Sequence, residues 1–252
     1  MAPLDSVMLA PMHLAFDADD TLWHNEPIFN LTQDNVAELL APWATAADLG
    51  DRLNDIERRN LSLFGYGSKG FTLSLIETAL EISGGQLPGE VVQKILDHGK
   101  AMIEHPVELL PGVRETLEGL RGRHPLLLIT KGDLFHQETK VARSGLADHF
   151  DIIEIVSEKD PDTYRRLLDF HDIAPERFVM VGNSVKSDIL PVVAIGGNAI
   201  HIPYESTWEL DRVDHRGAEA EGFFEVPSIS EVPAMLERIA ALGGDAAAAA
   251  VD

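Results

Sequence analysis

Four short groups of polar residues, spread along the chain in a regular order, could together handle a phosphoryl group. Each group stands at or just past the end of a strand-like apolar segment. They are, in chain order, Asp17 with Asp19, then Thr130, then Lys159, and finally the stretch 182–188 with Asn183 and Asp188. Together they would supply a nucleophile, a proton donor, groups that bind phosphate and a site for a metal ion.

The first group offers two carboxylates for the hydrolysis of a phosphate ester. Asp17 is the expected nucleophile, because a carboxylate that attacks phosphorus forms an acyl phosphate and divides a difficult hydrolysis into two easier steps. Asp19, two residues further on, would protonate the leaving oxygen and later remove a proton from the attacking water. Alone, this spacing is a weak signal, since Asp-x-Asp also occurs in loops and in unrelated metal sites.

The second and third groups could bind the phosphoryl oxygens. Thr130 offers a hydroxyl, and the N–H groups that follow it, at Lys131 and beyond, could bind a further oxygen. Lys159 offers a fixed positive charge for the nucleophile and for the phosphoryl group. Lys131 and Lys186 remain alternatives for the role of Lys159.

The acidic and amide side chains predict a magnesium site. Asn183 and Asp188, together with Asp17 and Asp19, form a set of possible ligands that contains only oxygen donors. Mg²⁺ favours carboxylates and substrate phosphate, and it keeps several of its waters. The ion would neutralise the approach of two anions and polarise the phosphoryl group.

The elements that must position these residues alternate between short apolar strands and amphipathic helices. We expect strands at 13–16, 126–129, 152–156, 178–181 and 199–202, and helices at 113–121, 137–144, 163–170 and 189–195. This alternation predicts an α/β protein with a parallel sheet that helices cover on both faces. In such sheets ligands bind beyond the carboxyl ends of the strands, where residues distant in sequence can meet.

Residues 25–105 break this alternation and predict an all-helical insert. Apolar residues three and four apart indicate helices at 31–40, 46–63, 71–82 and 91–103, with glycine and proline between them. We therefore divide the chain into a catalytic core, residues 1–24 and 106–252, and an inserted helical domain. Residues 243–252, which hold two glycines and an alanine run, predict a flexible tail.

Composition restricts the partners of the protein. The 252 residues carry a net charge of −22, which argues against nucleic acid and anionic membranes as partners, because both would be repelled. No apolar run approaches the roughly 18 residues that cross a bilayer, and the N-terminal residues do not resemble a secretory signal. Without cysteine there are no disulfides and no thiolate metal sites. We expect a cytoplasmic protein, either a monomer or a homodimer.

The order D-x-D-x-T, strand-end threonine, lysine and G-N-x-x-x-x-D resembles the haloacid dehalogenase-like hydrolase superfamily. The resemblance covers residues 14–202 and implies a doubly wound, Rossmann-like core, Mg²⁺ dependence and an aspartyl intermediate. The helical insert resembles the first class of cap domain in that superfamily. Asp19 fits the phosphatase pattern, because dehalogenating members usually lack an acid there. Two departures are Asn183, where many members have aspartate, and Asp160-Pro161 after the lysine, where Lys-Pro is commoner.

In capped members of the superfamily, the cap usually senses the leaving group of the substrate. The turn 64–70 is the best candidate to reach the active site, since its glycines permit close approach of the backbone. Tyr66 and Lys69 of this turn are expected to contact substrate. Trp23, just after the first motif, and Lys131 are further expected substrate contacts.

These observations predict a Mg²⁺-dependent phosphatase that acts on a small phosphorylated metabolite. Two alternatives stay open. One is a hydrolase of the same family that cleaves C–halogen or C–P bonds. The other is a catalytically degenerate member that binds phosphate or a protein partner.

Overall fold

One parallel sheet forms the centre of the protein. A computed structural model describes residues 11–206, 208–211 and 221–249 of the chain. In this part of the chain six strands pair in the order β3-β2-β1-β4-β5-β6, all parallel. They are β1 (His13–Phe16), β2 (Leu126–Lys131), β3 (Ile152–Val156), β4 (Phe178–Gly182), β5 (Asn198–His201) and β6 (Phe223–Glu225). The predicted α/β class with a doubly wound parallel sheet is confirmed.

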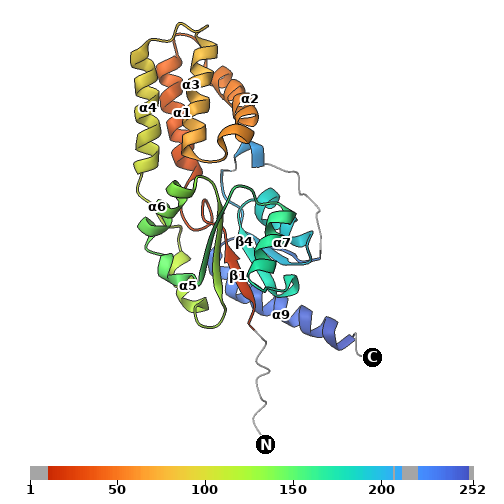
Figure 1. Cartoon of the computed structure of the whole chain (residues 1–252). Coiled ribbons are helices and arrows are strands. Elements are labelled where there is room, and N and C mark those ends of the chain that lie inside the picture. The colour runs from red at the N-terminus through yellow and green to blue at the C-terminus, as the bar shows by residue number, and fades with distance from the viewer. Residues whose placement is uncertain (1–10, 207, 212–220, 250–252) are drawn as a thin grey trace, which may run out of the picture.

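Alternate residues of the strands enter two hydrophobic cores, one on each face of the sheet. Leu14 and Phe16 of β1 belong to one core, whereas Ala15 between them belongs to the other. Helices α5 (Val113–Leu120), α6 (Leu134–Ser144) and α9 (Val232–Ala249) pack on the first face. Helices α7 (Pro161–Phe170) and α8 (Leu190–Val193) pack on the second, and Figure 1 shows α5 and α7 on opposite sides of the strands. A strand with both faces buried needs a continuous apolar sequence, as β1 and β4 have.

Four helices inserted after β1 form a separate layer with its own core. They are α1 (Glu26–Leu40), α2 (Ala46–Phe64), α3 (Ser68–Ile82) and α4 (Gly89–Glu104). Buried Val36, Leu53, Leu75 and Ile95 contribute to this core, one from each helix. Figure 1 shows the four helices stacked at one end of the sheet. The division of the chain into a core and an inserted cap domain stays a prediction to which this arrangement lends support.

Several boundaries differ from the predicted ones. Strand β2 extends to Lys131, so Thr130 lies within the strand and not at its end. Helix α1 begins at Glu26, because Pro27 suits the first helical turn although no apolar repeat marks it. Strand β6 was not predicted, since three residues are too few for a periodic signal.

The C-terminal helix covers part of the predicted flexible tail. Helix α9 is helical through Ala249, and residues 250–252 lie outside the described residues. In the described part of the chain, no helix combines the length and the apolar character that crossing a bilayer requires.

Candidate active site

Asp17 stands at the carboxyl end of the central strand β1, at the edge of the sheet where the loops converge. Its backbone N–H donates to the Val181 carbonyl of the neighbouring β4 at 2.9 Å, which fixes the peptide. Its Oδ2 accepts a hydrogen bond from the Thr21 hydroxyl at 3.1 Å. Its Oδ1 accepts from Lys159 Nζ at 2.5 Å. The backbone of Asp17 is therefore fixed by β4, and its carboxylate is held in one orientation by Thr21 and Lys159.

Lys159 and Asp188 complete a buried charge cluster with Asp17. Lys159 Nζ also donates to Asp188 Oδ1 at 2.7 Å, and the lysine side chain is only 1% exposed. Burial raises the pKa of the Asp17 carboxyl to about 7, against the opposing effect of the Lys159 ammonium. Burial by itself would lower the pKa of Lys159, but Asp17 and Asp188 outweigh it and raise this pKa. Two carboxylates thus share one ammonium, so the cluster has more acidic groups than cationic groups.

A glycine and a short π-helical turn place Asp188 beside this ammonium. The turn runs over Val185–Ile189 and follows β4 directly. Asp188 Oδ2 accepts from the Ser184 backbone N–H at 2.9 Å. The carboxylate packs against Gly182, where a Cβ atom would lie 2.3 Å from Asp188 Oδ2. Only glycine leaves room for Asp188 at this position.

We expect Gly182→Ala to lower kcat by about 100-fold or more, because the new methyl group must push the Asp188 carboxylate away from Lys159. Gly119→Ala in α5 is the matched control, since nothing lies within 4 Å of a Cβ built there. The kcat of both variants is measured on a chromogenic phosphate ester. Equal kcat values for the two alanine variants would contradict this account of Gly182.

Asp19 is held by a different set of groups. Its Oδ1 accepts from Trp23 Nε1 at 2.6 Å and its Oδ2 from Gln137 Nε2 at 3.1 Å. Lys140 Nζ lies 2.6 Å and 2.7 Å from the two oxygens. Burial alone would raise the pKa of Asp19, but the Lys140 charge and the hydrogen bonds from Lys140, Trp23 and Gln137 together outweigh it and hold this pKa below its ordinary value. Asp19 is therefore a carboxylate in the unliganded protein.

The structure places the other predicted phosphate ligands beside these carboxylates. Thr130 Oγ1 accepts from Gln137 Nε2 at 2.7 Å, so one amide joins Thr130 to Asp19. Lys131 Nζ donates to Ser187 Oγ at 2.8 Å and pairs with Asp211 at 3.2 Å. Lys159, and not Lys131, thus contacts the predicted nucleophile.

Two of the predicted substrate contacts lie away from the cavity. Trp23 is buried in the sheet core, where its indole N–H orients Asp19. Lys69 extends outward to Asp133 at 2.9 Å and is half exposed. Neither residue lines the main cavity, whereas Tyr66 does. Both residues were expected near the substrate because of their positions in the sequence. A tryptophan among apolar neighbours, however, gains more free energy from burial than from contact with solvent.

The donor set fits a magnesium ion. Asp17 and Asp188 offer carboxylate oxygens at one end of the cavity, and Asn183 Oδ1 lies close by, at 3.2 Å from the Thr21 hydroxyl that also contacts Asp17. In the described residues no group of three or more aspartate, glutamate or histidine side chains is placed to hold a metal ion, so the remaining ligands of a Mg²⁺ ion here would be Asn183, waters and substrate phosphate. A divalent cation would also supply the positive charge that the cluster lacks. The side-chain carboxylate of Asp19, the predicted fourth ligand, faces Lys140 instead.

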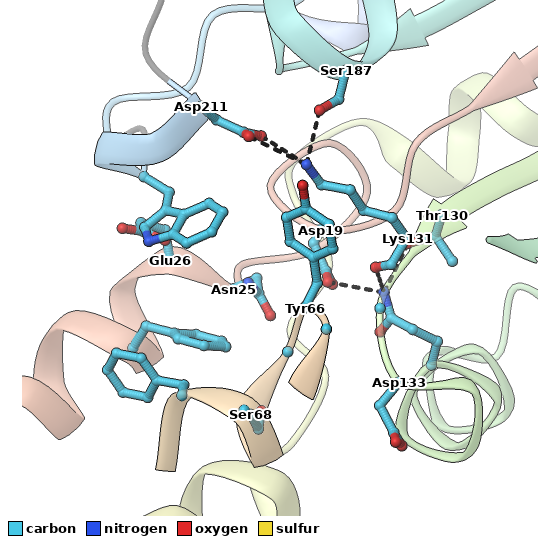
Figure 2. A pocket seen from close by; sticks show the side chains of 18 of the residues that line it. Asp19, Asn25, Glu26, Tyr66, Ser68, Thr130, Lys131, Asp133, Ser187 and Asp211 are labelled. Carbon is cyan, nitrogen blue, oxygen red and sulfur yellow. Dashed lines mark hydrogen bonds and ion pairs between the residues drawn. The ribbon is translucent and has the colours of Figure 1, made fainter. Parts of the chain in front are cut away.

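These groups line a cavity of about 150 Å³ between the sheet and the inserted helices. Figure 2 shows Thr130 and Lys131 on one side and Asn25, Glu26 and Tyr66 facing them from the other. Sequence reasoning missed several lining residues: Glu57, Gln137, Lys140, Ser187, Trp208 and Asp211. Only the 137–140 spacing, which places both side chains on one face of a helix, was a signal that could have found two of them.

Glu57 of α2 is a half-buried acid at the far end of this cavity. Burial raises its pKa to about 7 from 4.5, although a hydrogen bond from the Trp208 side chain opposes the shift. A carboxyl whose pKa is higher in the folded than in the unfolded state costs stability as pH rises between those two values.

We expect Glu57→Gln to unfold at a higher urea concentration than the wild type at pH 8, with a gain of up to about 3 kcal/mol. The gain should shrink as the pH falls towards 4.5, the ordinary pKa of glutamate, because well below that value both states hold the proton. Urea unfolding between pH 5 and pH 8 measures it, with Asp51→Asn on the exposed side of the same helix as control. Unfolding curves whose separation does not change with pH would contradict the burial argument.

Comparison with known proteins identifies the class to which this fold and site belong. The model of the haloacid dehalogenase-like hydrolase family matches residues 11–196. The chain is a member of this family, as the sequence predicted.

Two of the similar proteins span most of the chain, and a third spans about half of it. A solved haloacid dehalogenase-like family hydrolase from Xanthomonas campestris is 42% identical, covers 97% of each chain and superposes with a TM-score of 0.85. A glyceraldehyde 3-phosphate phosphatase from Pyrococcus furiosus is 26% identical over 227 residues, which are 86% of this chain and 90% of the relative. A pyrimidine 5'-nucleotidase, YjjG of Escherichia coli, is 28% identical over 131 residues, 47% of this chain and 58% of its own.

Proposed function

We propose that this protein is a Mg²⁺-dependent phosphatase that hydrolyses a small phosphate monoester through an aspartyl phosphate at position 17. The observation that carries the proposal is the buried cluster of Asp17, Lys159 and Asp188, with a second carboxylate, Asp19, at the same cavity. The two curated relatives described above, a phosphatase and a nucleotidase, support the same reaction class.

In the first step Asp17 attacks the phosphorus atom. A bond forms between the carboxylate oxygen and phosphorus, and the bond to the leaving oxygen breaks. Lys159 favours the ionised form of Asp17, and Thr130 and Lys131 bind phosphoryl oxygens. The leaving oxygen takes a proton from Asp19. Lys140 disfavours protonated Asp19 in the free protein, but the negative charge of the bound phosphoryl group opposes Lys140 and favours the proton.

In the second step water hydrolyses the aspartyl phosphate. Asp19, now a carboxylate again, removes a proton from the attacking water, and phosphate leaves with Asp17 restored. Gln137 joins Asp19 to Thr130 and so fixes the proton-transfer group relative to the phosphoryl oxygens. Asp17, Asn183 and Asp188 would hold Mg²⁺, which supplies charge neutralisation to the phosphoryl group when bound.

We also propose that the inserted helices form a cap over the cavity. Residues 25–105 are the cap, and the remaining residues are the catalytic core. Tyr66 of the turn between α2 and α3 donates to Glu158 of the core at 2.7 Å. This contact ties the two layers together above Lys131. We place the enzyme in the cytoplasm, as a monomer or homodimer.

Hydrolysis of p-nitrophenyl phosphate tests the proposal. We expect turnover that requires Mg²⁺, is lost when EDTA is added and returns when Mg²⁺ is restored in excess. Ca²⁺ at the same concentration is the control, because its larger and more flexible coordination suits the small site less well. Release of halide from a 2-haloacid without any release of phosphate would instead favour the dehalogenase alternative.

A further inference from the structure

The cavity has two ends with different chemistry. The end formed by the sheet edge holds the lysines Lys131, Lys140 and Lys159, which suit a phosphoryl group. The far end is formed by residues of α1, α2 and α3, the turn between the last two, and the segment that contains Trp208. The leaving group of a bound phosphate monoester must occupy this far end.

The far end is acidic. Glu26 and Glu57 line it, and among the described residues 25–74, 206 and 208 no lysine, arginine or histidine does. Glu26 also adds to the rise in the pKa of Glu57, after the larger effect of burial. Two carboxylates at this end of the cavity would repel a second negative charge on the substrate and attract a positive one.

Aromatic rings form the remaining walls. Phe29 and Phe71 lie with ring centroids 4.9 Å apart, and Tyr66 meets Trp208 edge to face at 5.9 Å. The Trp208 side chain also forms a hydrogen bond with Glu57, so a carboxylate and an indole lie side by side at the far end of the cavity. Lys131 Nζ lies 4.2 Å from the centroid of the Tyr66 ring, which shows that this ring already accepts a cation on its face. Figure 2 shows Tyr66 between the two ends of the cavity.

We infer that the enzyme selects phosphate monoesters whose leaving group carries an amine cation, and rejects those whose leaving group carries a carboxylate or a second phosphate. This inference rests on the proposed phosphatase function and adds the substrate class to it. An ammonium at the far end would gain from Glu57 and from the aromatic faces. A carboxylate there would lie against Glu26 and Glu57, at an end that no lysine, arginine or histidine of the described residues 25–74, 206 and 208 lines. A leaving group with a neutral hydroxyl should bind with an affinity between those of the ammonium and the carboxylate.

Three phosphate monoesters of equal length distinguish a cationic, a neutral and an anionic leaving group. They are O-phosphoethanolamine with an ammonium, 2-hydroxyethyl phosphate with a hydroxyl and 2-phosphoglycolate with a carboxylate. Each is measured as a competitor of p-nitrophenyl phosphate hydrolysis in the presence of Mg²⁺, so that binding is seen whether or not the competitor turns over. We expect inhibition constants that rise in the order ammonium, hydroxyl, carboxylate, with at least about tenfold between the first and the last.

Glu57→Gln tests the origin of this order, because it removes the charge and keeps the shape. The variant should lose most of the preference for ammonium over carboxylate, whereas Asp51→Asn on the exposed side of α2 should keep it. Equal inhibition by the three compounds, no inhibition by any, or a preference for 2-phosphoglycolate would overturn the inference and leave the phosphatase proposal standing. Absence of p-nitrophenyl phosphate hydrolysis in the wild type would overturn the proposed function itself.

Discussion

Asp17→Asn is expected to lower the kcat for p-nitrophenyl phosphate by at least about 10⁴-fold, because it removes the nucleophile on which both steps depend. Asparagine keeps the shape of the side chain and can still accept the Thr21 hydrogen bond. Lys159 keeps one carboxylate partner, Asp188, at 2.7 Å. The fold should therefore survive, and the loss of activity should report on chemistry alone.

Asp20→Asn is the matched control for this variant. Asp20 is also buried and has a left-handed backbone with φ of 61°, which asparagine tolerates. Its carboxylate accepts from the backbone N–H groups of Asn25 and Glu26 at the start of α1, and it contacts none of the cluster around Lys159. We expect kcat within about tenfold of the wild type. Activity that survives in Asp17→Asn, or an equal loss in both variants, would refute Asp17 as the nucleophile.

Lys159→Met should destabilise the protein by about 3–5 kcal/mol at neutral pH, because it leaves the Asp17 and Asp188 carboxylates buried without their ammonium. It should also lower kcat by about 100-fold or more, since the phosphoryl group loses a fixed positive charge. Mg²⁺ should recover part of the lost stability, because an ion that binds only the folded protein shifts the equilibrium towards it.

Urea unfolding with and without Mg²⁺ measures these effects. Lys69→Met is the control, because Lys69 forms an exposed ion pair with Asp133 that is worth less than about 1 kcal/mol. If Lys159→Met unfolded at the same urea concentration as Lys69→Met, the buried cluster would not be the charge arrangement described above. A stability that did not respond to Mg²⁺ would contradict the metal-binding role of Asp17 and Asp188.

The central part of the site was predictable because the carboxyl ends of parallel strands lie at the same edge of the sheet. Asp17 and Asp188 follow β1 and β4, neighbouring strands in the sheet, and Lys159 follows β3 at the same edge. Apolar runs located these strands, so the meeting of three distant residues followed from topology. Tyr66 was predictable for a similar reason, since it lies in a glycine-rich turn between two helices of the insert.

The groups that tune the site could not be predicted, because their roles depend on side-chain packing. The spacing of Gln137 and Lys140 places both side chains on one helix face, but it does not show that this face meets Asp19, whose charge and position they determine. Trp208 and Asp211 come from a segment after β5 without hydrophobic periodicity. Trp23 was expected near substrate, but its large apolar ring is buried in the core and only its N–H reaches the site.

A covalent phosphoryl group on Asp17 is the most direct sign of the proposed reaction. The enzyme is mixed with p-nitrophenyl phosphate and Mg²⁺, stopped with acid within the first turnovers, digested and analysed by mass spectrometry. We predict that the peptide that contains Asp17 gains the mass of one phosphoryl group, and that reduction with borohydride converts this residue to homoserine. A phosphoryl group found on another residue, or phosphate release at full rate with position 17 unmodified throughout, would contradict the account.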